Sequence, residues 1–362
     1  MGYSISCKGS AFSIRIGLIY FMEEKFDIAV IGPETTKKRV RSVTQDNVNK
    51  TIAKRESIVR EFGIENPRWT LEYAVDQACR YLLKIHHKAG INLKKKDIPD
   101  VIFVDEKRKK ELEKAIQPYG GANFADKEAG SSSVWNGVVI IFVKEDITDL
   151  DQASIIFHEM FHFLGEQIIA ANEKSAAYGR QGYEIFGVNS PYKSWLLEGG
   201  LVTFESARFG EELATDTFYK KDSEIRTQMI EHAMQSGDIV EGRLKFDSGM
   251  EVEPRYLWIM PEYQGIKDRK AFGLPENSGL AGSFFELISS RFQGEEKDNF
   301  LNIVYAARRD LKLIPKLAGL IDDKFSRGTY ARMLKCERTE EAVWNFIQDL
   351  RGRTNSNSYR VT

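Results

Sequence analysis

Residues 157–162 read Phe157-His158-Glu159-Met160-Phe161-His162, a His-Glu-x-x-His motif inside an apolar stretch that is predicted to be helical. Four residues are about one turn of an α-helix, so the two imidazoles point the same way and can bind one metal ion. The carboxylate of Glu159 projects beside that ion, where it can take a proton from a metal-bound water. The alternative is a helix with two hydrogen-bonded histidines and no ligand role, but the surrounding sequence favours the metal.

A catalytic zinc site needs a third protein ligand, with water in the remaining position. The downstream candidates are Glu166, Glu184 and Glu198. Glu166 lies one turn further along the predicted helix axis than His162, and Glu184 lies in a segment without a predicted helix. Glu198 lies among leucines, where its burial is costly unless it is paired or bound to metal. The two glycines that follow it would let its helix approach the motif helix closely, so Glu198 is the expected third ligand.

Composition places the chain among ordinary globular proteins. Its 362 residues are 42% hydrophobic and 29% charged, with a formal net charge of −1. This balance gives no bulk attraction to nucleic acid. No stretch approaches the roughly 18 continuous apolar residues of a membrane span. We therefore expect neither a nucleic-acid partner nor a membrane span, and the sequence leaves the oligomeric state open.

Cysteine usage and the N-terminus bear on the compartment. Cys7, Cys79 and Cys336 are far apart and have neither metal-binding nor redox spacing. This usage is typical of a reducing compartment, so we expect a cytoplasmic protein. Two alternatives stay open. Residues 11–22 resemble a weak signal segment without a small-residue cleavage site, and Met22 is an alternative start.

Helix and strand signals alternate in the first half of the chain. Before the motif, the pattern predicts a strand at 26–31, a polar linker at 35–50, helices at 47–62 and 70–88, and buried strands at 99–105 and 138–143 with a charged helix between them. The motif helix is expected over 152–171, after a cap at Thr148, Asp149 or Asp151. Residues 172–192 are polar and carry several glycines, which favours a loop or lid before the helix of Glu198.

Beyond about residue 210 the pattern becomes mostly helical. Helices are predicted at 222–235, 279–292, 297–311, 327–334 and 340–350, with a hairpin within 239–263. We therefore expect three regions: an N-terminal extension or linker over 1–66, a catalytic domain over 67–210 and a mostly helical C-terminal domain over 211–362. The predicted fold class is α+β, in which a small sheet is followed by the motif helix, the Glu198 helix and the helical region.

The motif, together with Trp195-Leu196-Leu197-Glu198-Gly199-Gly200, resembles the gluzincin zinc metallopeptidases, and in particular their thermolysin-like and aminopeptidase-like members. The resemblance is specific over 137–209 and loose over 279–309. It implies a zincin-like fold in which His158, His162 and Glu198 bind Zn²⁺ and Glu159 is the general base. It also implies that 137–143 is the edge strand that pairs with an extended peptide, although its continuous apolar run equally fits a buried central strand.

One departure concerns the side chain that stabilises the oxyanion. The family usually has a tyrosine where this chain reads Asn277-Ser278-Gly279. Tyr263 is the favoured substitute because it lies in a predicted loop shortly before that region. The other candidates, which no motif places, are Tyr256, Tyr305 and His232.

These observations predict a zinc-dependent peptidase that acts on a peptide or protein substrate, with metal-activated water as nucleophile and Glu159 as base. The alternative is a catalytically weak or inactive relative that keeps the metal and acts as an interaction or regulatory protein. The absent tyrosine favours this alternative, and the intact Glu159 favours the enzyme. A selective regulatory peptidase, gated by the expected loop at 172–192, is a third reading.

Overall fold

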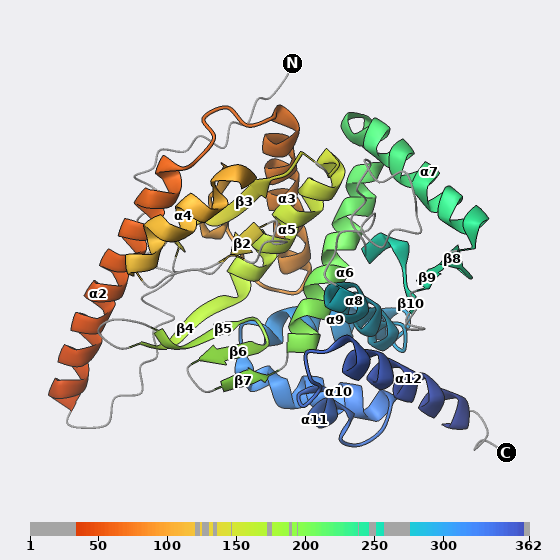
Figure 1. Cartoon of the computed structure of the whole chain (residues 1–362). Coiled ribbons are helices and arrows are strands. Elements are labelled where there is room, and N and C mark those ends of the chain that lie inside the picture. Colours follow the sequence, from red (N-terminus) through yellow and green to blue (C-terminus); the bar gives the residue numbers. More distant parts are fainter. Residues whose placement is uncertain are drawn as a thin grey trace.

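The computed structural model describes residues 34–119, 124, 130–132, 136–145, 147–171, 176–187, 190–193, 195–237, 239–245, 251–256 and 276–357. This part of the chain is α+β, mostly helical with small sheets (Figure 1). Its strands are β1 (Val101–Asp105), β2 (Gly130–Ser132), β3 (Val139–Val143), β4 (Glu166–Ala171), β5 (Ala176–Gln181), β6 (Glu184–Gly187), β7 (Ser190–Lys193), β8 (Ile239–Val240), β9 (Arg243–Lys245) and β10 (Glu251–Val252).

The α-helices make up most of the described chain. They are α2 (Glu34–Glu61), α3 (Trp69–Lys88), α4 (Lys109–Ile116), α5 (Asp149–Gly165), α6 (Trp195–Ala214), α7 (Lys220–Ser236), α8 (Glu276–Ser289), α9 (Glu295–Ala307), α10 (Ile314–Lys324), α11 (Thr329–Met333) and α12 (Glu340–Asn357). In Figure 1, α6 runs through the middle of the molecule, with α3 and α5 on one side and α8 on the other.

The first sheet has the strand order β1-β3-β2, with β1 parallel and β2 antiparallel to β3. Val139 and Ile141 of β3 belong to the core shared with α3 and α5, whereas Ile140 and Phe142 pack in a second core with α2 and α4. Both faces of β3 are therefore covered, which explains its unbroken apolar run. The expectation that 137–143 is an edge strand is wrong, and its alternative, a buried central strand, is confirmed.

Helix α5 carries the motif and begins where the cap was expected. Thr148 is the N-cap, and its hydroxyl oxygen accepts a hydrogen bond from the Asp151 amide at 3.1 Å. The helix ends at Gly165, so the predicted extension to residue 171 is wrong. The chain instead turns into β4, and the carbonyl of Gly165 accepts a hydrogen bond from the Gly182 amide at 2.8 Å.

The segment expected to be a loop or lid is a sheet. Strands β4, β5, β6 and β7 pair in sequence order as an antiparallel sheet. Gly182, at the turn between β5 and β6, has a φ of +56°, which favours glycine. The polar composition of 172–192 hid the strands, because polar residues interrupted by glycines give the same sequence pattern as a loop.

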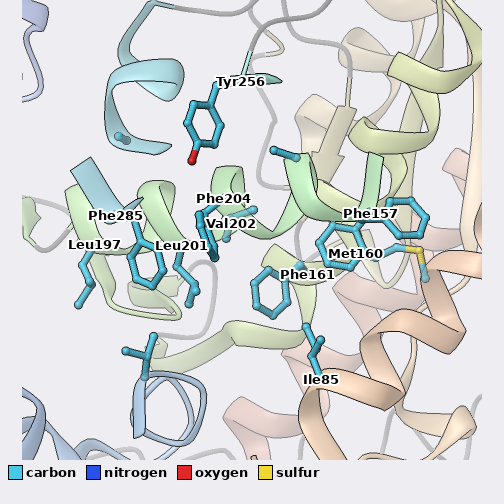
Figure 2. Close-up of a cluster of buried hydrophobic side chains, with 14 of the residues drawn as sticks. Ile85, Phe157, Met160, Phe161, Leu197, Leu201, Val202, Phe204, Tyr256 and Phe285 are labelled. Carbon is cyan, nitrogen blue, oxygen red and sulfur yellow. The ribbon is translucent and has the colours of Figure 1, made fainter. Parts of the chain in front are cut away.

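The close approach of α6 involves α8 rather than the motif helix. A Cβ atom at Gly200 would lie 2.6 Å from the carbonyl oxygen of Ala281 in α8. The expectation that these glycines face α5 is therefore wrong. Helix α6 meets α5 through larger apolar side chains. Figure 2 shows this core, with residues of α3, α5, α6 and α8 labelled: Ile85, Phe157, Met160, Phe161, Leu197, Leu201, Val202, Phe204 and Phe285.

Most of the predicted helices and the hairpin of β8 and β9 are confirmed. Two further differences remain: 35–50 lies in α2 rather than in a linker, and α10 was not predicted. The expected strand at 26–31 lies outside the described residues. One apolar core extends from Val48 to Leu350, so α8–α12 share it with α3, α5 and α6. The predicted region boundaries stay predictions. Within the described ranges, no helix has the length and apolar character to cross a membrane.

His86, in the last turn of α3, gives a testable pH dependence. It is buried, and its Nδ1 donates to the carbonyl of Leu82 at 2.7 Å. Burial lowers the pKa of His86 from 6.5 to about 3. Between the two pKa values, the imidazole of His86 is protonated in the unfolded chain and neutral in the folded chain. The free energy of unfolding should fall by about 1.4 kcal/mol for each pH unit lost below about 6.

Urea unfolding between pH 7.5 and 4.5 measures this slope. The His86→Leu variant should show a shallower slope than the parent. Equal slopes for the parent and His86→Leu would remove His86 as the cause.

Candidate metal centre

His158 and His162 lie on adjacent turns of α5, with ring centroids 4.7 Å apart and planes at 73°. The Nδ1 atom of His158 lies 3.3 Å from the hydroxyl of Ser206 in α6. Burial, together with the neighbouring His162 ring, holds the pKa of His158 well below its ordinary value. A neutral imidazole keeps a lone pair for a ligand, so the one-turn spacing yields two adjacent donors.

Glu198, in the first turn of α6, is fully buried beside them. Its Oε1 lies 3.3 Å from His162 Nδ1. Its Oε2 accepts hydrogen bonds from the Tyr183 amide at 3.1 Å and from Arg308 Nε at 3.0 Å, and Arg308 also donates to Oε1. Burial acts to raise the pKa of Glu198, but Arg308 and His162 outweigh it and hold the value at about 2. Glu198 is therefore a carboxylate that faces His162.

The donor types and one distance fit a divalent metal. Two ligands bound tetrahedrally to zinc at 2.0–2.1 Å are roughly 3.3 Å apart, which is close to the separation of His162 Nδ1 and Glu198 Oε1. His162 Nδ1 is buried, and its contact with Glu198 Oε1 is close enough for an ion pair but not aligned as a hydrogen bond. However, among the described residues, no group of three His, Cys, Asp or Glu side chains is closed around a common point. The residues fit zinc in kind, and Glu198 would have to be shared with Arg308.

Glu159 points toward β2 from the same helix. It is partly buried and accepts hydrogen bonds from the side chain and the backbone of Ser132. A Cβ atom at Gly130 would lie 2.6 Å from Cγ of Glu159, so only glycine leaves room for this carboxylate. Burial raises the pKa of Glu159, and His162 and Ser132 oppose the rise. A carboxylate with a raised pKa is a better proton acceptor near neutral pH.

The other two carboxylates considered as ligands take different places. Glu166 is buried as the first residue of β4, and its charge acts on Arg55 rather than on the histidines. Glu184 belongs to β6, and its side chain lies outside the described part of the chain. The structure therefore brings Glu198, and not Glu166, beside His162.

A cavity of about 270 Å³ borders His158. Helices α5, α6 and α7 and the short turn at Pro254–Tyr256 supply its walls. Thr203 and Ser206 contribute hydroxyls, and Thr203 Oγ1 is buried without a hydrogen-bond partner. Most of the remaining surface is apolar and includes Ala207 and Ile230, but four charged side chains also line the cavity: Asp151, Glu211, Arg226 and Arg255. The cavity therefore offers space for a mainly apolar group next to His158.

The described candidates for an oxyanion donor have different surroundings, and only one of them lines the cavity beside the proposed site. Tyr263, the favoured one, lies outside the described residues. Tyr305 is buried and donates to Glu205 at 2.6 Å, and His232 is exposed on α7. Tyr256 lines the cavity that borders His158, and its hydroxyl donates to Glu286 at 2.8 Å. In Figure 2 its ring lies over α6 near Phe204.

Sequence reasoning missed Arg308, Ser132 and Ser206, which all contact the predicted site residues. Arg308 follows the last residue of α9, 110 positions after Glu198. No local pattern indicates that an arginine at such a place is buried. A search among known protein families, curated proteins and solved structures found no match to this chain. The functional assignment therefore depends on the residues and their geometry.

Proposed function

We propose that the chain is a zinc-dependent peptidase of the gluzincin type. The observation that supports this most is the buried Nδ1 of His162, which faces Glu198 Oε1 at 3.3 Å without a well-aligned hydrogen bond, on a helix that also carries His158 and Glu159. A buried polar atom without a well-formed hydrogen bond is costly, and a metal bound between the two side chains would satisfy both. His158, His162 and Glu198 would bind the zinc.

When bound, zinc lowers the pKa of a coordinated water to around neutrality and polarises a carbonyl. Glu159 would accept the proton of the attacking water and then pass it to the leaving amine. The hydrogen bonds from Ser132 and the close packing of Gly130 fix the direction of this carboxylate. Ser206 would orient the ring of His158 through Nδ1.

Strand β2 is the best candidate for pairing with the substrate main chain. It pairs with β3 on one side, and among the described strands none pairs with its other edge. It runs antiparallel to β3 and lies against Glu159 through Gly130 and Ser132. An extended peptide that added to this edge would bring its carbonyls close to the proposed base.

The cavity beside His158 would receive a substrate side chain, and Ala207 provides a test. The Ala207→Leu variant adds three carbons to a mainly apolar wall. We expect kcat/KM to fall about tenfold or more for substrates whose side chain there is large, and little for substrates with alanine there. Paired peptides that differ only at that position measure the ratio. An equal effect on both peptides would mean that the substrate side chain does not bind in this cavity.

The oxyanion donor is tested with tyrosine variants. Loss of one such donor costs roughly 10²–10³ in rate. We expect Tyr263→Phe to lower turnover by about tenfold or more without a change in zinc content, and Tyr256→Phe is the matched comparison because Tyr256 lines the cavity. If only Tyr256→Phe is slow, the role moves to Tyr256. If neither is slow in an active protein, side-chain donation from these tyrosines is excluded.

One observation favours the second candidate, a catalytically weak or inactive relative that acts through interactions. Arg308 donates to both carboxylate oxygens of Glu198, the proposed ligand. Cleavage of an unfolded protein separates the two functions. The peptidase predicts cleavage that a chelator stops and added zinc restores. Zinc binding without cleavage of any unfolded substrate would favour the inactive relative.

A further inference from the structure

Arg308 is an unusual neighbour for a metal ligand. It is only 2% exposed, and it contacts Glu198 through Nε and a terminal nitrogen. The same terminal nitrogen donates to the carbonyl of Phe161 at 3.1 Å, and the guanidinium lies 4.1 Å from the centroid of the Phe161 ring. Arg308 therefore joins the end of α9 to α5 and α6 at the site itself.

The surrounding backbone is shaped around this ion pair. A Cβ atom at Gly165 would lie 2.5 Å from the terminal nitrogen of Arg308, and one at Gly182 would lie 1.8 Å from Oε2 of Glu198. The amide of Tyr183 donates to the same Oε2 at 3.1 Å. Two glycines thus leave the space that the charged pair fills, which ties the end of α5 and the β5–β6 turn to it.

The pair matters for metal binding because both charged side chains are buried, and a buried charge is costly. A buried charge that loses its partner is strongly destabilising. In this arrangement Arg308 neutralises Glu198 and occupies both carboxylate oxygens. A divalent cation placed beside His162 would be repelled by the guanidinium and would have to share Oε1 with it.

We propose that Arg308 is the counterion of Glu198 in the metal-free protein and competes with zinc for this carboxylate. Arg308 thereby stabilises the empty site and weakens zinc binding, and by reciprocity zinc weakens the Arg308–Glu198 pair. This inference rests on the proposed function, because it assumes that Glu198 is a zinc ligand.

The test measures two quantities in full-length variants: the melting temperature of the chelator-treated protein, and the zinc dissociation constant from competition with a chromophoric chelator. Arg308→Gln removes the charge and keeps hydrogen-bond donors. Arg308→Lys keeps the charge and loses the two-pronged contact. Arg309→Gln, the next position in the chain, is the matched control.

We expect Arg308→Gln to melt at a lower temperature than the parent without metal, and to bind zinc roughly tenfold more tightly. Arg308→Lys should bind zinc a few-fold more tightly, and Arg309→Gln should match the parent. Equal or weaker zinc binding by Arg308→Gln overturns the inference, because Arg308 would then support the ligand rather than compete for it. If Arg308→Gln does not fold, Arg308→Lys tests the inference instead, and zinc binding equal to or weaker than that of the parent overturns it.

The proposed function and this inference can fail separately. If the parent binds zinc and Arg308→Gln binds it no more tightly, only the competition is wrong. If the parent binds none and Arg308→Gln does, the competition is supported, and the parent is not a zinc enzyme. If neither binds zinc, both are wrong.

Discussion

Glu159→Gln is expected to abolish peptide hydrolysis and to leave folding and zinc content unchanged. The substitution keeps the size of the side chain and its contacts with Gly130 and Ser132, but it removes the proton acceptor. General acid–base catalysis alone contributes about 10²–10⁴ in rate, and here one residue would serve both proton transfers. The measurement is turnover of an unfolded protein substrate, with zinc determined on the same sample.

Glu211→Gln is the matched control, because Glu211 also lines the cavity but lies at the exposed end of α6. It should keep the parent's turnover within a few-fold. An active Glu159→Gln protein would contradict the proposed mechanism. Loss of zinc in that variant would instead place Glu159 among the ligands.

The second large effect concerns metal affinity. Changes to residues that only support a metal ligand typically cost 10–100-fold in affinity, so loss of a ligand should cost more than about 100-fold. We expect this loss for His158→Ala, His162→Ala and Glu198→Gln, measured as zinc dissociation constants. Glu166→Gln is the control, because Glu166 is buried but lies with Arg55 rather than with the histidines.

Glu198→Gln also leaves Arg308 without its carboxylate partner. Its folding must therefore be checked by circular dichroism before affinity is interpreted. If Glu198→Gln binds zinc as tightly as the parent while Glu166→Gln does not, the third ligand is Glu166 and the proposed site is wrong.

Local sequence patterns predicted the helices that carry the site residues. The one-turn spacing of His158 and His162 and the cap at Thr148 placed α5, and the apolar residues around Glu198 placed α6. These features depend on neighbours along the chain, which is why single-sequence reasoning recovers them. The end of α5 at Gly165 was missed because it depends on Gly182 and Arg308, which lie far away in sequence.

Strand order also depends on contacts between residues that are far apart in the sequence. The apolar run of β3 fits both an edge strand and a central one, and only the pairing with β1 and β2 decides between them. Under the proposed function, the pairing with a substrate main chain that was expected of β3 would fall to β2, whose Gly-Ser-Ser sequence carries almost no strand signal. Arg308 could not be found at all, because charge patterns along a sequence do not reveal which arginine is buried against a distant glutamate.

Zinc stoichiometry tests the central claim most directly. The purified protein is loaded with zinc, freed of excess metal and measured by mass spectrometry of the metal, beside the His158→Ala/His162→Ala double variant. We predict about one zinc per chain in the parent, removed by a chelator, and almost none in the double variant. A parent without zinc, or a double variant with as much zinc as the parent, would contradict the account.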